Sequence, residues 1–149
     1  RVRDAYRVIQ SYGEHVVCPD QRSLDACCEV VREACRQGRG SVWDCELLLA
    51  RMDWGRRCCL RRGVNMYPPD TLGTDLFDKG TWESDIRPDT DTLCILLDAL
   101  ALQVPFDPSA GMGDARRLVA SMEKYCGVRF DQRVAVHYAG VAVALSRAR

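Results

Sequence analysis

The chain has no excess charge of either sign and very little histidine. Its 149 residues contain 21 lysines and arginines against 21 aspartates and glutamates, so the formal net charge is zero. Proteins that bind nucleic acids normally carry a basic excess over the contact face, so this balance argues against that class. His15 and His137 are the only histidines. They are therefore the only imidazole groups available to an acid–base mechanism.

Several patterns that define other classes of protein are also missing. No segment shows the sustained alternation and β-branched residues of strands, so we expect no sheet. The longest apolar run, 134–145, is interrupted by His137 and is shorter than the roughly 20 residues that cross a bilayer. There is no Cys-x-x-Cys knuckle for zinc and no glycine-rich phosphate loop. We therefore expect no membrane segment, no metal site and no cofactor.

Cysteine, in contrast, is abundant, with nine residues. The adjacent pairs Cys27-Cys28 and Cys58-Cys59 are poor disulfide partners, and most cysteines fall in apolar segments where a free thiol behaves as a small buried hydrophobe. This predicts reduced core thiols in a protein of a reducing compartment, and hence a cytoplasmic location. Because the first residue is Arg1 rather than methionine, we expect the chain to be a segment of a longer protein.

Apolar residues recur at helical spacing along most of the chain. One stripe runs from Leu24 to Cys35, and equivalent stripes begin at Leu93, Ala115 and Val134. Proline and glycine fall between these stripes, as helix breakers do. The sequence predicts an all-α, single-domain bundle of six to seven helices over residues 1–149, with an irregular connection at 65–90. The expected helices are 3–17, 21–37, 41–62, 90–104, 113–126 and 131–147, with a short turn near 72–79.

The last expected helix differs from the others, because apolar and small residues surround it on nearly every side. A helix that is apolar all round has to be covered all round. We therefore expect helix 131–147 to be the central helix of the bundle, with Ala139 and Gly140 among the small residues that permit close packing.

One short segment points to a function. Glu46-Leu47 is followed, several residues later, by Met52-Asp53-Trp54-Gly55-Arg56. This pattern resembles the BH1 motif of the Bcl-2 family, with Asp53 in place of the usual asparagine. Glycine permits the close approach of another helix, and an adjacent arginine can bind a carboxylate on that helix through two hydrogen bonds. A tryptophan at this point can close one end of an apolar groove.

A second segment, Leu24-Asp25-Ala26-Cys27-Cys28-Glu29-Val30, resembles the family's BH3 pattern, with Cys28 at the small position and Glu29 at the acidic one. The order of an N-terminal helix, a BH3-like helix and a BH1-like motif agrees with the family over about the first 60 residues. Departures follow: three arginines lie in the segment 57–62, Pro68-Pro69 comes soon after, and no tryptophan-based BH2 motif is evident. Divergent viral members, such as those of poxviruses, also keep the bundle while losing readable motifs.

The resemblance implies a non-enzymatic protein that holds an amphipathic, BH3-type helix in a groove and inhibits apoptosis as part of a host–virus interaction. A homodimer is also consistent with it. An alternative is the same fold used to block innate immune signalling to NF-κB. The residues that the resemblance assigns to partner binding are Leu47, Leu48, Met52, Trp54, Gly55 and Arg56.

Other readings of the residues stay open. The chain would also suit a helical bundle with an unrelated partner. The segment Leu49 to Trp54 faintly resembles the signature of death-fold adaptors, although such a domain needs only some 80–90 residues. An enzyme would need a nucleophile beside a base, for which His15 and Cys18 are the nearest pair. The acids Asp85, Asp89 and Asp91 are typical of a solvated loop, because no EF-hand spacing accompanies them.

Overall fold

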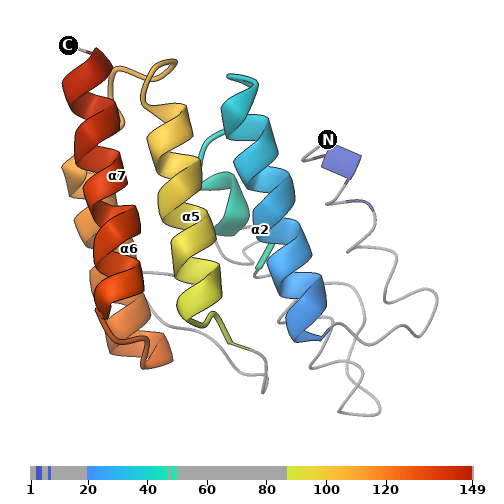
Figure 1. Ribbon diagram of the computed structural model, residues 1–149. Coiled ribbons are helices and arrows are strands. Elements are labelled where there is room, and N and C mark those ends of the chain that lie inside the picture. The colour runs from blue at the N-terminus through green and yellow to red at the C-terminus, as the bar shows by residue number, and fades with distance from the viewer. Residues whose placement is uncertain (1–2, 5–6, 8–19, 47, 50–86, 149) are drawn as a thin grey trace.

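The structure is a computed structural model, and it describes residues 3–4, 7, 20–46, 48–49 and 87–148 (Figure 1). All regular structure in this part of the chain is helical. Four complete helices are defined. They are α2 (Gln21–Arg36), α5 (Thr90–Gln103), α6 (Met112–Cys126) and α7 (Gln132–Ala148). The four corresponding helix predictions are confirmed to within one or two residues at each end.

Polar side chains set where three of these helices begin. The Asp20 carboxylate accepts a hydrogen bond from the backbone N–H of Ser23 at the start of α2. Asp89 does the same for Thr92 in α5, and Asp131 for Val134 in α7 at 2.9 Å. Each carboxylate satisfies an N–H that has no partner within its own helix. The helix boundaries are therefore encoded locally.

The helices α2, α5 and α7 lie side by side and run in the same direction, with α5 between the other two (Figure 1). Helix α6 runs the opposite way and contacts both α5 and α7. Helix α5 is therefore the element that every other described helix contacts. The candidate site lies on the side of the α2–α5–α7 layer that carries Arg32, Asp98 and His137.

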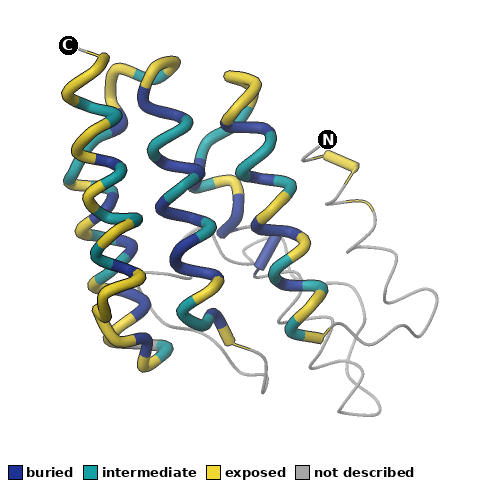
Figure 2. Tube along the Cα trace, in the orientation of Figure 1, coloured by how far each residue is buried: buried dark blue, intermediate teal, exposed yellow. Residues whose placement is uncertain are grey.

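The central helix is α5, so the expectation that helix 131–147 occupies the centre is wrong. Buried residues surround α5, whereas α7 buries fully only Val134 and Val141 (Figure 2). The reason is side-chain volume. Helix α5 carries Leu93, Leu96, Leu97 and Leu100, all at most 1% exposed, while the apolar residues of α7 are mainly alanine, glycine and valine. Larger side chains release more free energy on burial, so the leucine-rich helix occupies the core.

The core is rich in thiols. Cys27, Cys28, Cys35, Cys45 and Cys94 are buried and Cys126 is half-buried, and all six are free. The prediction of reduced core cysteines is confirmed for these six positions. Burial raises the pKa of each thiol, to about 12 for Cys27 and Cys35 and to about 11 for Cys126. Since the thiolate is the reactive form, these cysteines are poor nucleophiles in the folded protein.

The expected helices 3–17 and 41–62 are described only in part. Residues 3, 4 and 7 are helical, as are 44–46 and 48–49. The expected turn near 72–79 and almost all of the connection at 65–90 lie outside the described residues. Within the described helices, none has the length and apolar character needed to span a membrane.

Candidate functional site

Of the six residues that the sequence assigns to partner binding, the structure describes one. Leu48 is 1% exposed and belongs to the hydrophobic core. Leu47, Met52, Trp54, Gly55 and Arg56 lie outside the described residues, so their arrangement stays a prediction. The BH3-like segment falls on α2, where Leu24 and Cys28 are fully buried. That apolar face of α2 is used within the fold.

The chain that leads into the BH1-like motif is held by a cluster of polar contacts. The Arg117 guanidinium of α6 lies 3.0 Å from a carboxylate oxygen of Glu46 and 3.9 Å from the ring centroid of Trp43. The indole N–H of Trp43 donates to Asp114 at 3.2 Å. The side-chain oxygen of Gln103 in α5 accepts from the backbone N–H of Val42 at 2.8 Å. Residues 42–46 are thereby fixed against α5 and α6.

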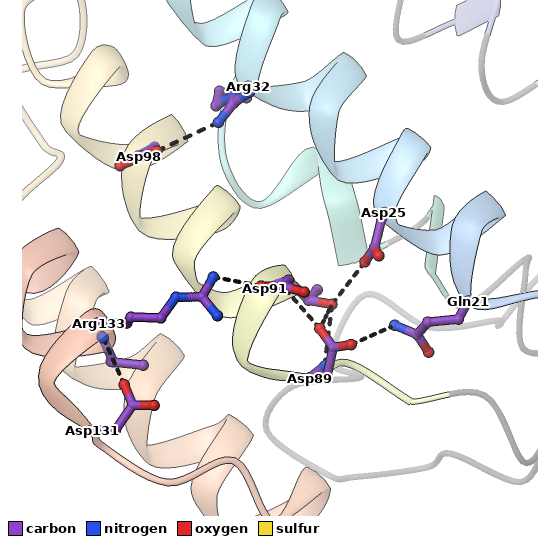
Figure 3. Close-up of polar contacts among 10 residues, drawn as sticks. Gln21, Asp25, Arg32, Asp89, Asp91, Asp98, Asp131 and Arg133 are labelled. Atoms are coloured by element: carbon purple, nitrogen blue, oxygen red, sulfur yellow. Dashed lines mark hydrogen bonds and ion pairs between the residues drawn. The ribbon is translucent and has the colours of Figure 1, made fainter.

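Polar pairs join the three parallel helices across their solvent-facing side (Figure 3). At the N-terminal end, Gln21 donates to Asp89 at 3.3 Å and Arg133 pairs with Asp91 at 2.5 Å. Near the middle, Arg32 of α2 contacts Asp98 of α5 (Figure 3), and His137 of α7 contacts the same aspartate. The His137 Nδ1 atom lies 2.6 Å from Asp98 Oδ1.

Asp25 lies beside the acids at the start of α5. Desolvation raises its pKa, and the negative charges of Asp89 and Asp91 raise it further. A hydrogen bond from the hydroxyl of Thr92, 3.1 Å from Asp25 Oδ1, acts in the opposite direction. Among the described residues, no group of three or more histidine, cysteine or acidic side chains is placed to hold a metal ion.

At the C-terminal end of the same face, the polar pairs give way to an open apolar groove of about 540 Å³. The end of α5 and the turn after it form one wall, and α7 forms the other. The apolar lining consists of Ala101, Leu102, Pro105, Phe106, Gly140, Val143, Ala144 and Ala148. Arg36 and Arg147 also line the groove, and each lies in the last turn of its helix.

Large apolar side chains in this groove remain in contact with solvent. Phe106 is 60% exposed and Val143 is 48% exposed. The ring of Phe106 stands over Gly38, which has φ +68°; a Cβ at that glycine would lie 2.8 Å from the ring. The glycine thus allows both the left-handed end of α2 and the close approach of Phe106. The turn after α5 is held against the turn after α2.

Sequence reasoning did not identify this groove. It singled out the small residues of the last helix but interpreted them as positions of close core packing. The sequence signal that could have found the groove is the difference in side-chain size between α5 and α7. When two apolar helices compete for the centre of a bundle, the helix with the smaller side chains is left partly uncovered. Which residues of α7 then meet α5 depends on tertiary packing.

The groove offers apolar surface with two cations at its edge. Comparisons of the chain with protein-family models, with curated proteins and with solved structures gave no match in any of the three.

Proposed function

We propose that the chain is a non-enzymatic protein-binding module that holds an amphipathic helix in the groove between α5 and α7. The observation that carries the proposal is the apolar groove itself, with Phe106 and Val143 on its walls and about half or more of each side chain exposed. A contiguous exposed apolar surface with a polar edge is typical of protein-binding sites. An amphipathic helix lays its apolar stripe into such a groove.

The charges at the groove add to this argument. Arg36 and Arg147 lie at the edge of the lining, so a partner that carries carboxylates beside its apolar stripe is favoured over a basic one. The Asp98 pairs with Arg32 and His137 lie on the same face. The partner therefore meets polar surface at one end and apolar surface at the other, which gives it one preferred orientation.

The BH1-like motif narrows the proposal to a partner class. It supports a Bcl-2-like bundle of six to seven helices that binds BH3-type helices and inhibits apoptosis in a host–virus setting. In that case Arg56 pairs with the partner's acid, and Arg56→Ala weakens binding by about 2–5 kcal/mol, the cost of breaking an interfacial charge pair. The same bundle acting on innate signalling adaptors is the second partner class to be tested.

The experiment measures the fluorescence anisotropy of labelled helical peptides on titration with the protein. The panel contains BH3-type peptides, helices from NF-κB pathway adaptors, and scrambled peptides of the same composition. Val143→Glu introduces a charge into the groove, while Val136→Glu introduces the same charge on the same helix at a residue that does not line the groove. We expect Val143→Glu to weaken binding by at least about tenfold and Val136→Glu not to weaken it.

Each result has a defined meaning. Binding that is lost with Arg56→Ala but kept with Val143→Glu moves the site to the BH1-like motif and overturns the α5–α7 groove. Equal affinity for the native and scrambled peptides overturns specific helix binding altogether. Circular dichroism of each variant checks that the helices are intact.

A further inference from the structure

Helix α7 has a second apolar side that points away from the core. Val136 is 65% exposed and Val143 is 48% exposed, and between them lie the exposed Ala139 and the half-buried Gly140. We call these four residues the outer α7 face. In Figure 2 the exposed colour recurs along α7, whereas the central helix α5 is mostly buried. The outer α7 face is therefore uncovered within the fold.

Gly140 lies on this face and also lines the groove between α5 and α7. A Cβ added to Gly140 would meet no described atom within 4 Å. Glycine inside a helix costs about 0.5–1 kcal/mol relative to alanine. Packing among the described residues does not require this glycine, so the fold loses stability without a gain. What a helical glycine allows is the close approach of another backbone.

The spacing of residues along α7 is self-complementary. In an antiparallel pair of α7 helices whose midpoint lies between residues 139 and 140, Val136 of each copy comes level with Val143 of the other. Arg147 comes level with Gln132 and next to Asp131 of the second copy. Asp131 and Arg147 are both exposed, so the pair brings opposite charges together at each end. In a parallel pair, Arg147 of one copy would instead lie against Arg147 of the other, so that like charges meet.

The helix dipoles also favour the antiparallel pair. In the antiparallel pair the negative C-terminal end of one α7 lies beside the positive N-terminal end of the other. A symmetric contact of this kind closes after two copies. We propose that a second copy of this chain covers the outer α7 face and forms an antiparallel α7–α7 dimer about a twofold axis near Ala139 and Gly140.

This dimer goes beyond the proposed helix binding and does not depend on it. Val136 and Ala139 belong to the outer α7 face and do not line the groove. A Val136→Glu protein that binds peptides normally would separate the two proposals, because it tests the dimer alone. Gly140 and Val143 belong to both surfaces, so a bound helix and a second copy compete for them.

The first test is sedimentation velocity over a range of protein concentrations. We expect the wild-type chain to reach twice the monomer mass and Val136→Glu to remain a monomer. Ala120→Glu, at an exposed alanine of α6, is the matched control and should dimerise as the wild type does. If the wild-type chain stays monomeric at every concentration, the proposal is overturned and the outer α7 face is left for a different partner. A Val136→Glu protein that still dimerises also overturns the proposal.

The second test fixes the orientation of the helices by oxidative cross-linking. At 1.5 Å rise per residue, the two copies of residue 139 are about 1.5 Å apart along the axis, whereas the two copies of residue 136 are about 10 Å apart. A disulfide forms only between Cα atoms within about 7 Å. We therefore expect Ala139→Cys to form a covalent dimer and Val136→Cys not to form one, each compared with the unmodified chain under the same oxidation. Cross-linking at both positions indicates a parallel pair, and cross-linking at neither excludes this interface; both outcomes overturn the proposal.

Discussion

The guanidinium of Arg117 stacks on the ring of Trp43, 3.9 Å from its centroid, while it also reaches the carboxylate of Glu46. A cation over an indole ring gains electrostatic energy, and the guanidinium keeps its hydrogen-bonding edge free for an acid. The Glu46 side chain is only 4% exposed. The charge of Arg117 is thus what makes a buried carboxylate tolerable at the start of the BH1-like motif.

Removing this cation takes the ion pair with Arg117 away from the buried Glu46. We expect Arg117→Leu to lower the free energy of unfolding by about 2–3 kcal/mol, somewhat below the range for a fully buried pair because Arg117 is partly exposed. In the double variant Arg117→Leu, Glu46→Gln the loss should be smaller than the sum of the single losses. Urea denaturation of the four proteins measures this coupling, and strict additivity would contradict the arrangement.

The two aspartates on the solvent-facing side of α5 offer a matched comparison. Asp98 contacts Arg32 and His137 with side chains that are 28–37% exposed, whereas Asp91 pairs with Arg133 through side chains that are 59–60% exposed. Exposed pairs contribute little because water and salt screen them. We expect Asp98→Ala to cost about 1 kcal/mol and Asp91→Ala to cost about 0.3 kcal/mol or less. Thermal unfolding of both variants in low and high salt checks the order.

The raised pKa of Asp25 leads to a pH-dependent prediction. A carboxyl group whose pKa is higher in the folded state binds its proton more tightly there. Its contribution to stability is therefore fully present below the pKa of the unfolded chain, 3.8, and is lost as the pH rises through the pKa of the folded state. Asp25→Asn removes the charge and keeps an oxygen that can accept from Thr92. At neutral pH the variant should be more stable than the wild type by on the order of 0.5 kcal/mol.

The control for this prediction is the same comparison in acid. Below pH 3.8 the wild-type Asp25 is protonated, so the advantage of the asparagine variant should disappear. Urea titrations of both proteins at several pH values follow the difference between them, in which the titration of other carboxylates cancels. A gain in stability that does not change with pH would show that the charge of Asp25 is not its cause.

Two glycine-to-alanine substitutions should act in opposite directions. Gly38 has φ +68° and the Phe106 ring in the way of a Cβ, so Gly38→Ala should destabilise the fold by about 1–2 kcal/mol. Gly140 lies in a regular helix with open space at its Cβ position, so Gly140→Ala should stabilise the monomer by up to about 1 kcal/mol. Thermal unfolding at low protein concentration measures the change in stability of both variants. A loss of stability with Gly140→Ala would mean that a neighbour lies closer than the structure indicates.

Much of the fold could be predicted from the sequence because it is encoded locally. The stripe from Leu24 to Cys35 is spaced for one helical face, and this prediction agrees with the structure, in which both residues are buried. Contacts between residues that are far apart in the sequence could not be predicted in this way. Asp98 and His137 are 39 positions apart, and no local pattern pairs them. Likewise, the periodicity of α5 and α7 indicates two apolar helices and does not rank them for the centre.

The candidate site, too, has one part that was visible in the sequence and another that depends on tertiary packing. The BH1-like motif was visible as a string of residues, but of its assigned residues the structure describes only Leu48, which lies in the core. The groove combines the end of α5, the turn after it and one side of α7, with Arg36 from a third helix. Its residues are spread over more than a hundred positions. Only the packing of the helices brings them together.

The concentration of thiols in the core has a consequence for how the protein must be handled. While the chain is folded, burial keeps the thiols of Cys27, Cys28 and Cys35 protonated and shielded from oxidants. On unfolding, their acidity returns to that of a free cysteine, and nine thiols on one chain become able to form mispaired disulfides. Recovery of the native state from denaturant should then fall sharply in air and be restored by a reductant, so that the redox state of the solution decides whether unfolding is reversible.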